Sequence, residues 1–191
     1  MTGQGFCLFD TAVGACAVVW GARGIVAVQL PEADAARTRA RIARRYPGAV
    51  EHEPPAAVAE AIHAMTALIA GERRDLSAIP VDLDAASDFQ RAVYAVARAI
   101  PPGETMTYGE IASQVGDASA ARAVGEAMGR NPVPIIVPCH RVLGAGGKLT
   151  GFSANGGVAT KLKLLEIEGA AIGDEAPLFG DLPRAVKPAR R

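Results

Sequence analysis

The sequence has little that could stabilise a fold covalently, because its 191 residues include only three cysteines. An odd number of cysteines without a secretory context argues against a disulfide framework and indicates a reducing compartment. No apolar run approaches the roughly 18 residues that a membrane-spanning helix needs. The N-terminus also lacks the basic region and apolar core of a signal peptide. We therefore expect a cytoplasmic protein without a membrane partner.

The sequence also lacks net charge, because 20 basic side chains balance 20 acidic ones. Overall electrostatics therefore cannot drive tight binding to nucleic acid, and any such binding must use a local surface. Hydrophobic residues make up 50% and charged residues 21%, which excludes disordered, collagen-like and coiled-coil chains. The length suits one globular domain of ordinary size or two small ones.

The N-terminal part reads as a sheet followed by two helices. Residues 5–30 contain three β-favouring apolar stretches separated by turn-forming segments, which predicts a strand meander. Helices are predicted at 32–46, which ends before a proline, and at 54–70, which a proline pair opens. The acidic, proline-containing stretch 71–84 is typical of a linker. We place a domain boundary near Asp84, with domains at 1–84 and 85–191.

Five arginines lie in the predicted helix 32–46. They could bind phosphate, or they could form a solvated helix face. We favour the solvated face, because Glu32 and Asp34 accompany them.

The second part reads as short, well-capped helices. Capping-box patterns that begin at Ser87 and Thr107 predict helices to about residues 100 and 116. Ser119 is predicted to cap a third helix, from Ala120 to about Gly129. The last two helices suggest helix-turn-helix geometry. The many small residues of the third could allow close approach to a nucleic-acid groove, or simple packing on a neighbouring helix, which spacing alone favours.

The densest chemistry lies in the segment NPVPIIVPCHRV, residues 131–142. Its three prolines predict a stiff, extended segment that carries Cys139 and His140 side by side. A thiol titrates at about 8.5 unless it is assisted, and a histidine could serve as its base. Neighbouring side chains of an extended chain point to opposite faces, so we expect a water to relay the proton. Glu166 or Glu168 could hold the imidazole. From the residues alone, Cys139 is equally well a nucleophile or a small buried hydrophobe.

Together with TYGEIA, AARAVGEAMGRNP and GFSANGGVATKLKLLEIEGA, this segment resembles the O6-alkylguanine-DNA alkyltransferase family, the methylated-DNA–protein-cysteine methyltransferases. The resemblance covers about residues 89–170, and residues 1–84 match only in general plan. It implies a mixed α/β (α+β) protein. A ribonuclease-H-like domain of sheet and helices would occupy 1–84. A mostly helical, winged or helix-turn-helix-like active-site domain would occupy 85–191, with a tail at 171–191.

The resemblance also implies an activity, namely irreversible, single-turnover transfer of a methyl or alkyl group from O6-alkylguanine in DNA to Cys139. The base would be flipped out through the minor groove of double-stranded DNA, with little sequence specificity. No cofactor is implied. Activity on O4-alkylthymine stays open, and a monomer is the default expectation.

Five residues match the family's catalytic positions. Cys139 matches the alkyl acceptor, His140 its water-linked base and Glu168 the acid that orients the histidine. Asn131 matches a residue that braces the segment. Tyr108 matches the tyrosine whose hydroxyl binds guanine N3 and assists its departure.

Further residues match positions that touch DNA. Arg122 matches the arginine that inserts where the base was. The positions pressed against the minor groove or the base are Ala121, Gly125 and Met128. Those that match the walls of the base pocket are Val142, Phe152 and Ser153.

The chain departs from the family pattern in the loop 152–157, which is two residues longer than in the family's shorter forms. Some relatives bind structural zinc, but the potential ligands Cys7, Cys16, His52 and His63 do not fall at matching positions, so we predict no metal site. The tail could pack on the domain through Leu178 and Phe179, or fray.

Three other functions fit parts of the pattern. A lesion-binding sensor that recruits other repair factors would lack the acceptor cysteine, which is present here. A transcription regulator would need a further sensor or activation domain. A cysteine hydrolase would turn over, whereas a thioether cannot hydrolyse, so stoichiometry separates hydrolase from alkyl acceptor.

Overall fold

A computed structural model describes residues 3–170 of the chain. The predicted tail, with Leu178 and Phe179, lies outside the described residues. The N-terminal strands β1 (Gly5–Thr11), β2 (Gly14–Gly21) and β3 (Gly24–Gln29) form the predicted antiparallel meander. A short strand, β4 (Val50–Glu51), pairs parallel with β1 and gives the order β3-β2-β1-β4. The sequence did not predict β4, because two exposed residues carry no recognisable alternation.

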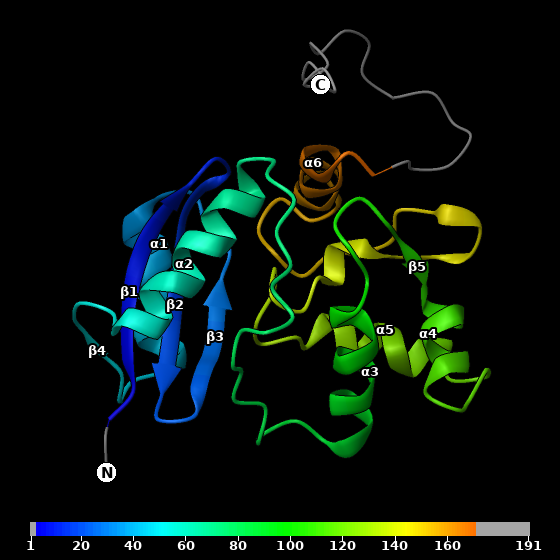
Figure 1. Ribbon diagram of the computed structural model, residues 1–191, viewed down its shortest axis with the longest axis horizontal. Helices are drawn as coiled ribbons and strands as arrows, with labels where there is room; N and C mark the ends of the chain where they lie inside the picture. The colour runs from blue at the N-terminus through cyan, green and yellow to red at the C-terminus, as the bar shows by residue number, and fades with distance from the viewer. Residues whose placement is uncertain (1–2, 171–191) are drawn as a thin grey trace, which may run out of the picture.

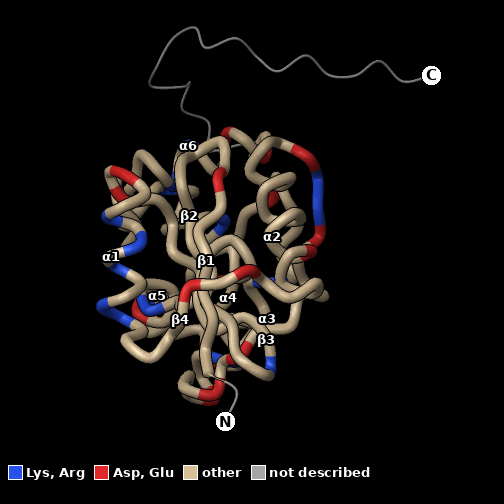
Figure 2. The backbone as a smooth tube through the Cα atoms, turned by 90° about the vertical axis from the view of Figure 1, so that its left-hand side faces the viewer, with Lys and Arg blue, Asp and Glu red and all other residues tan. Residues whose placement is uncertain are grey.

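Two helices, α1 (Ala35–Arg45) and α2 (Ala56–Ile69), cover opposite faces of this sheet (Figures 1 and 2). Successive side chains of a strand point to opposite faces, so the central strand β2 contributes buried side chains to both faces of the sheet. Val19 packs in one cluster with Ile42 of α1, whereas Val18 belongs to a larger cluster that contains Met65 of α2. The near-continuous apolar run of β2 therefore reflects burial on both sides.

The segment between the two predicted domains has no helix, as expected of a linker, but it is tied to its surroundings. The backbone of Ile25 in β3 bonds to Pro80 and Asp82, at 2.9 and 2.8 Å. The Arg98 guanidinium donates to the carbonyls of Ser77 and Ile79. The larger core cluster also contains residues from both sides of the segment. The boundary near Asp84 thus separates two stretches of chain that share one core.

Four helices build the C-terminal part: α3 (Asp88–Arg98), α4 (Tyr108–Gln114), α5 (Ala121–Gly129) and α6 (Val158–Glu168). Both predicted capping boxes are confirmed, with the side chains of Ser87 and Thr107 capping α3 and α4. In Figure 1, α3, α4 and α5 lie beside the sheet, and α6 lies at the top between the two parts.

The predicted Ser119 cap is wrong. The residue that caps α5 is Ala120, and it makes no side-chain bond to the helix. Ser119 instead donates from its backbone N–H and its hydroxyl to Asp117 Oδ1, at 2.9 and 2.6 Å. Asp117 closes a local turn two residues upstream, and this turn takes up the serine that would otherwise cap the helix.

The expected extended segment before Cys139 is also wrong. Its backbone turns back on itself, with a bond of 2.9 Å from Val137 N–H to the Val133 carbonyl and a positive φ of 77° at Ile135. Cys139–Arg141 then form a turn of 3-10 helix, η1. Prolines remove ladder donors, which favours turns over a strand here. A second such turn, η2, spans Ala145–Gly147.

Among the helices of residues 3–170, none is long and apolar enough to cross a membrane.

Candidate active site

A short parallel ladder brings distant parts of the sequence together. Strand β5 (Met106–Thr107) pairs with β6 (Val142–Leu143). Tyr108 follows β5 directly, and Cys139–Arg141 directly precede β6. This pairing therefore fixes where the first turn of α4 lies relative to the cysteine segment.

Cys139 lies at the buried end of a cavity of about 60 Å³, with 6% of its surface exposed. The loop before α6 supplies Phe152 and Ser153 to the wall, and Asn131 also lines it. Ser153 and Arg45, on the same wall, are exposed, so the cavity reaches from the surface to the thiol. Three of the predicted site residues thus surround the cysteine.

Asn131 holds the turns before the cysteine. Its Nδ2 donates to the Val137 carbonyl at 2.8 Å, and its Oδ1 accepts from Val133 N–H at 3.0 Å. The Asn131 side chain thereby satisfies two backbone groups of a segment that pairs with no described strand at these positions. This geometry suits the bracing position predicted for Asn131.

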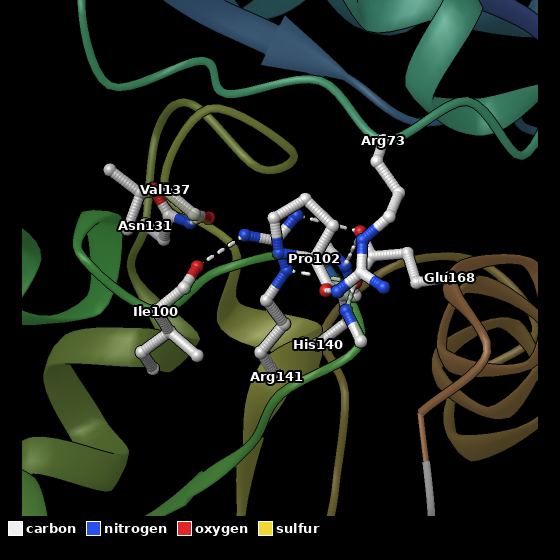
Figure 3. Close-up of polar contacts among 9 residues, drawn as sticks. Arg73, Ile100, Pro102, Asn131, Val137, His140, Arg141 and Glu168 are labelled. Carbon is white, nitrogen blue, oxygen red and sulfur yellow. Dashed lines mark hydrogen bonds and ion pairs between the residues drawn. The ribbon is translucent and has the colours of Figure 1, made fainter.

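His140, Arg141 and Glu168 form a buried cluster (Figure 3). His140 Nε2 lies 2.9 Å from Glu168 Oε1. Arg141 donates from Nε to Oε2 and from Nη2 to Oε1 of the same carboxylate, at 2.8 and 2.7 Å, and from Nη1 to the Ile100 carbonyl at 2.6 Å. Of the two predicted carboxylates, Glu168 thus contacts the histidine, while Glu166 is exposed.

The charges of the cluster decide which proton His140 carries. Burial alone would raise the pKa of Glu168, but bonds and charges from His140 and Arg141 outweigh it and lower the pKa to about 2. An ionised carboxylate only accepts, so Nε2 must be the donor. Burial lowers the pKa of His140, which favours the neutral ring with an unprotonated Nδ1. Within the described part of the chain, this buried Nδ1 has no hydrogen-bond partner, so it is free to accept a proton.

Burial also raises the pKa of the Cys139 thiol, an effect that the Asn131 side chain and the Lys161 charge partly oppose. The resting sulfur is therefore protonated at neutral pH. Because only the thiolate form of a cysteine is strongly nucleophilic, this thiol would need a base in order to react.

Sequence reasoning missed Lys161, a lysine of α6 with no exposed surface. Its Nζ donates to the Val142 carbonyl at 2.6 Å and lies 3.4 Å from the Thr150 carbonyl. The ammonium also lies 5.8 Å from the centre of the Tyr108 ring, whose hydroxyl accepts from Thr150 Oγ1 at 3.4 Å. Lys161 thus links the tyrosine to the strand that follows the cysteine. Arg141 was missed too, although it lies within the PCHRV motif.

The outer face of α5 carries small residues and one cation. The Arg122 side chain is 94% exposed, and its nearest carboxylate is Glu126 Oε1 at 3.6 Å. Ala121 and Gly125 are partly exposed beside it. Met128, also predicted to lie against the minor groove or the base, is 4% exposed and packs with Val124 in the core. Met128 lies on the inner side of the helix, where the apolar stripe must point.

Val142 and the potential metal ligands do not gather at the site. Val142 is fully buried and lies outside the cavity wall, although its carbonyl binds Lys161. Among residues 3–170, no group of three or more His, Cys, Asp or Glu side chains could hold a metal ion. His52 packs edge-on against the Trp20 ring, with the ring centres 5.1 Å apart.

Residues 88–170 match the family model for the DNA binding domain of 6-O-methylguanine DNA methyltransferase. A methylated-DNA–protein-cysteine methyltransferase of Mycobacterium tuberculosis is 48% identical over 126 residues, which are 65% of this chain and 73% of the relative. The crystal structure of the O6-methylguanine methyltransferase of M. tuberculosis has a TM-score of 0.69 at 36% identity and covers 92% of this chain and 96% of its own. A structure of the M. tuberculosis protein in complex with DNA has a TM-score of 0.68 at 38% identity, over 86% and 92% of the two chains.

A sheet-and-helix half joined to a helical half that buries a Cys-His pair defines the alkyltransferase class of fold. The chain belongs to the methylated-DNA–protein-cysteine methyltransferase family. The resemblance read from the sequence, and the mixed α/β class, are thereby confirmed.

Proposed function

We propose that this protein repairs O6-alkylguanine in double-stranded DNA by moving the alkyl group to its own Cys139, once per molecule. The observation that carries the proposal is a thiol at the inner end of a surface cavity, followed in the chain by the buried His140, which contacts the Glu168 carboxylate at 2.9 Å. Family membership supports a DNA-repair alkyltransferase and DNA as its partner. The residue roles below rest on the geometry of this chain.

The transfer is a displacement at the alkyl carbon. The Cys139 thiolate attacks that carbon, a C–S bond forms, and the bond from carbon to guanine O6 breaks. Its electron pair stays with the guanine, which must gain a proton to leave as a neutral base. The thiol proton must reach a base first, and a thioether remains on the protein.

His140 is the base that this chain offers. Its Nδ1 can accept a proton through a bridging water, as the resemblance implies, while Nε2 keeps its bond to Glu168. The imidazolium that forms gains an ion pair with the carboxylate. Glu168 therefore acts as a positioning residue that stabilises the charged histidine.

Tyr108 is the group proposed to donate a proton or a hydrogen bond to guanine N3. The Lys161 ammonium lies 5.8 Å from the centre of its ring, and the tyrosine hydroxyl accepts from Thr150 Oγ1. Lys161 also favours the charged thiolate of Cys139. One buried cation thus lies beside the proposed donor and favours the ionised form of the proposed acceptor.

The exposed small face of α5 is proposed to enter the minor groove. Small side chains let the helix backbone approach the DNA closely, and the groove's poor code leaves little sequence specificity. Arg122 extends from this face and is proposed to fill the space of the flipped base. Phe152 and Ser153 would then contact that base in the cavity.

Intact-protein mass spectrometry after mixing with duplex DNA that contains one O6-methylguanine tests the proposal. We expect one added methyl per molecule, mapped to Cys139 and absent in Cys139→Ala. Tight lesion binding without any mass gain would contradict it and indicate the sensor function. Methyl gain beyond one equivalent, or product formation beyond one per protein, would contradict single use.

A further inference from the structure

Helix α1 contributes two arginines to the cavity that leads to Cys139. Arg41 and Arg45 line it together with residues of the cysteine segment and the loop before α6. They are one helical turn apart and so share a face of α1. In Figure 2, α1 and α5 both lie toward the left-hand edge of the molecule.

The two arginines differ in their partners. Arg41 Nη1 lies 3.2 Å from Glu32 Oε1, and this oxygen also accepts from Gln29 Nε2 at 3.2 Å. Arg41 is therefore neutralised and fixed as part of the wall. Arg45 is exposed, and its guanidinium carbon lies 5.5 Å from the centre of the Tyr46 ring. Among the described residues, it forms no ion pair with a carboxylate.

Arginines in the last turn of a helix also favour its negative end, which accounts for the presence of Arg44 and Arg45. That effect does not account for the place of Arg45 at the rim of the cavity. A cation–π contact of this kind uses none of the N–H donors at the edge of the guanidinium. Such an edge suits two parallel bonds to a phosphate.

We propose that Arg45 binds a backbone phosphate of the damaged strand beside the flipped nucleotide. The inference rests on the function proposed above. A base that enters the cavity leaves its sugar and phosphates at the rim, where Arg45 lies. The N-terminal half would thereby contribute a DNA contact, and the contact supplies the local positive charge that a chain of zero net charge needs.

The salt dependence of DNA affinity tests the inference. Binding to a duplex with one O6-methylguanine is measured in a Cys139→Ala background between about 50 and 300 mM KCl. Arg45→Gln should lower the slope of log K against log salt by about 0.9 and the affinity roughly eightfold at 0.1 M salt. Arg39→Gln is the matched control, because Arg39 lies on the same helix, pairs with Glu51 at 2.9 Å and does not line the cavity.

An unchanged slope in Arg45→Gln, or an equal change in Arg39→Gln, would overturn the inference. With Cys139 intact, the rate of transfer from the duplex should fall more in Arg45→Gln than the rate from the free base O6-benzylguanine, which has no phosphate. An equal fall with both substrates would also overturn it. A wild-type protein that accepts no alkyl group from either substrate would refute the proposed function, whereas the salt slopes would still decide the role of Arg45.

Discussion

At the scale of single residues, the site is governed by one carboxylate that a histidine and an arginine share. Glu168 is 3% exposed in its side chain and accepts from both His140 and Arg141. Removing one member of such a buried set leaves the others uncompensated, which typically costs about 3 to 5 kcal/mol. The same group therefore orients the proposed base and holds α6 against the cysteine turn.

Glu168→Gln should lower the free energy of unfolding at pH 7 by a few kcal/mol. Because the folded pKa is depressed to about 2, the wild-type carboxylate contributes stability above the unfolded value of about 4.3, and this is lost as pH falls through the folded value. Urea titrations should thus show wild-type stability decreasing from about pH 5 to 2, and a shallower decrease in Glu168→Gln. Exposed Glu166→Gln is the control, and equal pH profiles for wild type and Glu168→Gln would contradict this account.

Lys161→Met should make Cys139 harder to ionise. Burial already raises the pKa of this thiol, and the lysine charge opposes the rise. Without that charge, the pKa should rise further, so the pH at which Cys139 reacts half-maximally with a small alkylating reagent should move upward. Peptide mapping follows Cys139 separately from Cys7 and Cys16. Lys163→Met, at an exposed position of the same helix, should leave the midpoint in place; a shift there of the same size would argue for overall charge instead.

The sequence predicted the role of a residue only where that residue belongs to a recognisable motif. PCHRV pointed to Cys139 and His140, and the end of the last helix offered Glu168. Lys161 could not be predicted, because a lysine on an amphipathic helix is normally solvated. Its burial depends on carbonyls of Val142 and Thr150, which only the folded chain brings to it.

At the scale of elements, local signals predicted helices well and the cysteine segment poorly. Ser87 and Thr107 begin helices because their capping bonds are made within four residues. The paired strands β5 and β6 have two residues each, and each depends on a partner 36 positions away in the chain. The turns before Cys139 likewise depend on Asn131, whose bonds no periodic pattern reveals.

Gly125→Leu tests the face of α5. A Cβ at this position would lie 4.0 Å from the Tyr108 ring, which is an ordinary contact. Leucine also has a higher helix propensity than glycine, so the fold should stay stable. A leucine there should nevertheless weaken duplex binding at least tenfold if the helix backbone meets DNA. Ala123→Leu, at an exposed position toward the other side of α5, is the control for added apolar surface. Equal affinities of the two variants would contradict the proposed contact.

At the scale of the whole molecule, the two halves share one core. Strand residues such as Val18 and helix residues such as Tyr94 belong to the same buried cluster. The alternation along the strands predicted the sheet, but it could not predict that one face would continue into the second half. The composition of the chain changes at residues 71–84, but the buried core contains residues from both sides of this segment.

Thermal unfolding should therefore be one cooperative transition, with equal calorimetric and van't Hoff enthalpies. Arg98→Met should lower its midpoint, because the guanidinium ties the linker carbonyls of Ser77 and Ile79 to α3. Arg91→Met, on the same helix and exposed, should change the midpoint little. Two separate wild-type transitions would show that the halves fold independently.

The left-handed backbone at Ile135 is compatible with a protein that reacts only once. A β-branched residue in this region costs about 1 to 3 kcal/mol, and the surrounding structure must hold it there. Enzymes that turn over have to reopen and release what they make. In the function proposed here, the thioether on Cys139 is permanent, so the segment does not have to open again to release a product. A rigid, deeply seated nucleophile is then no handicap, because every copy is consumed by its first encounter.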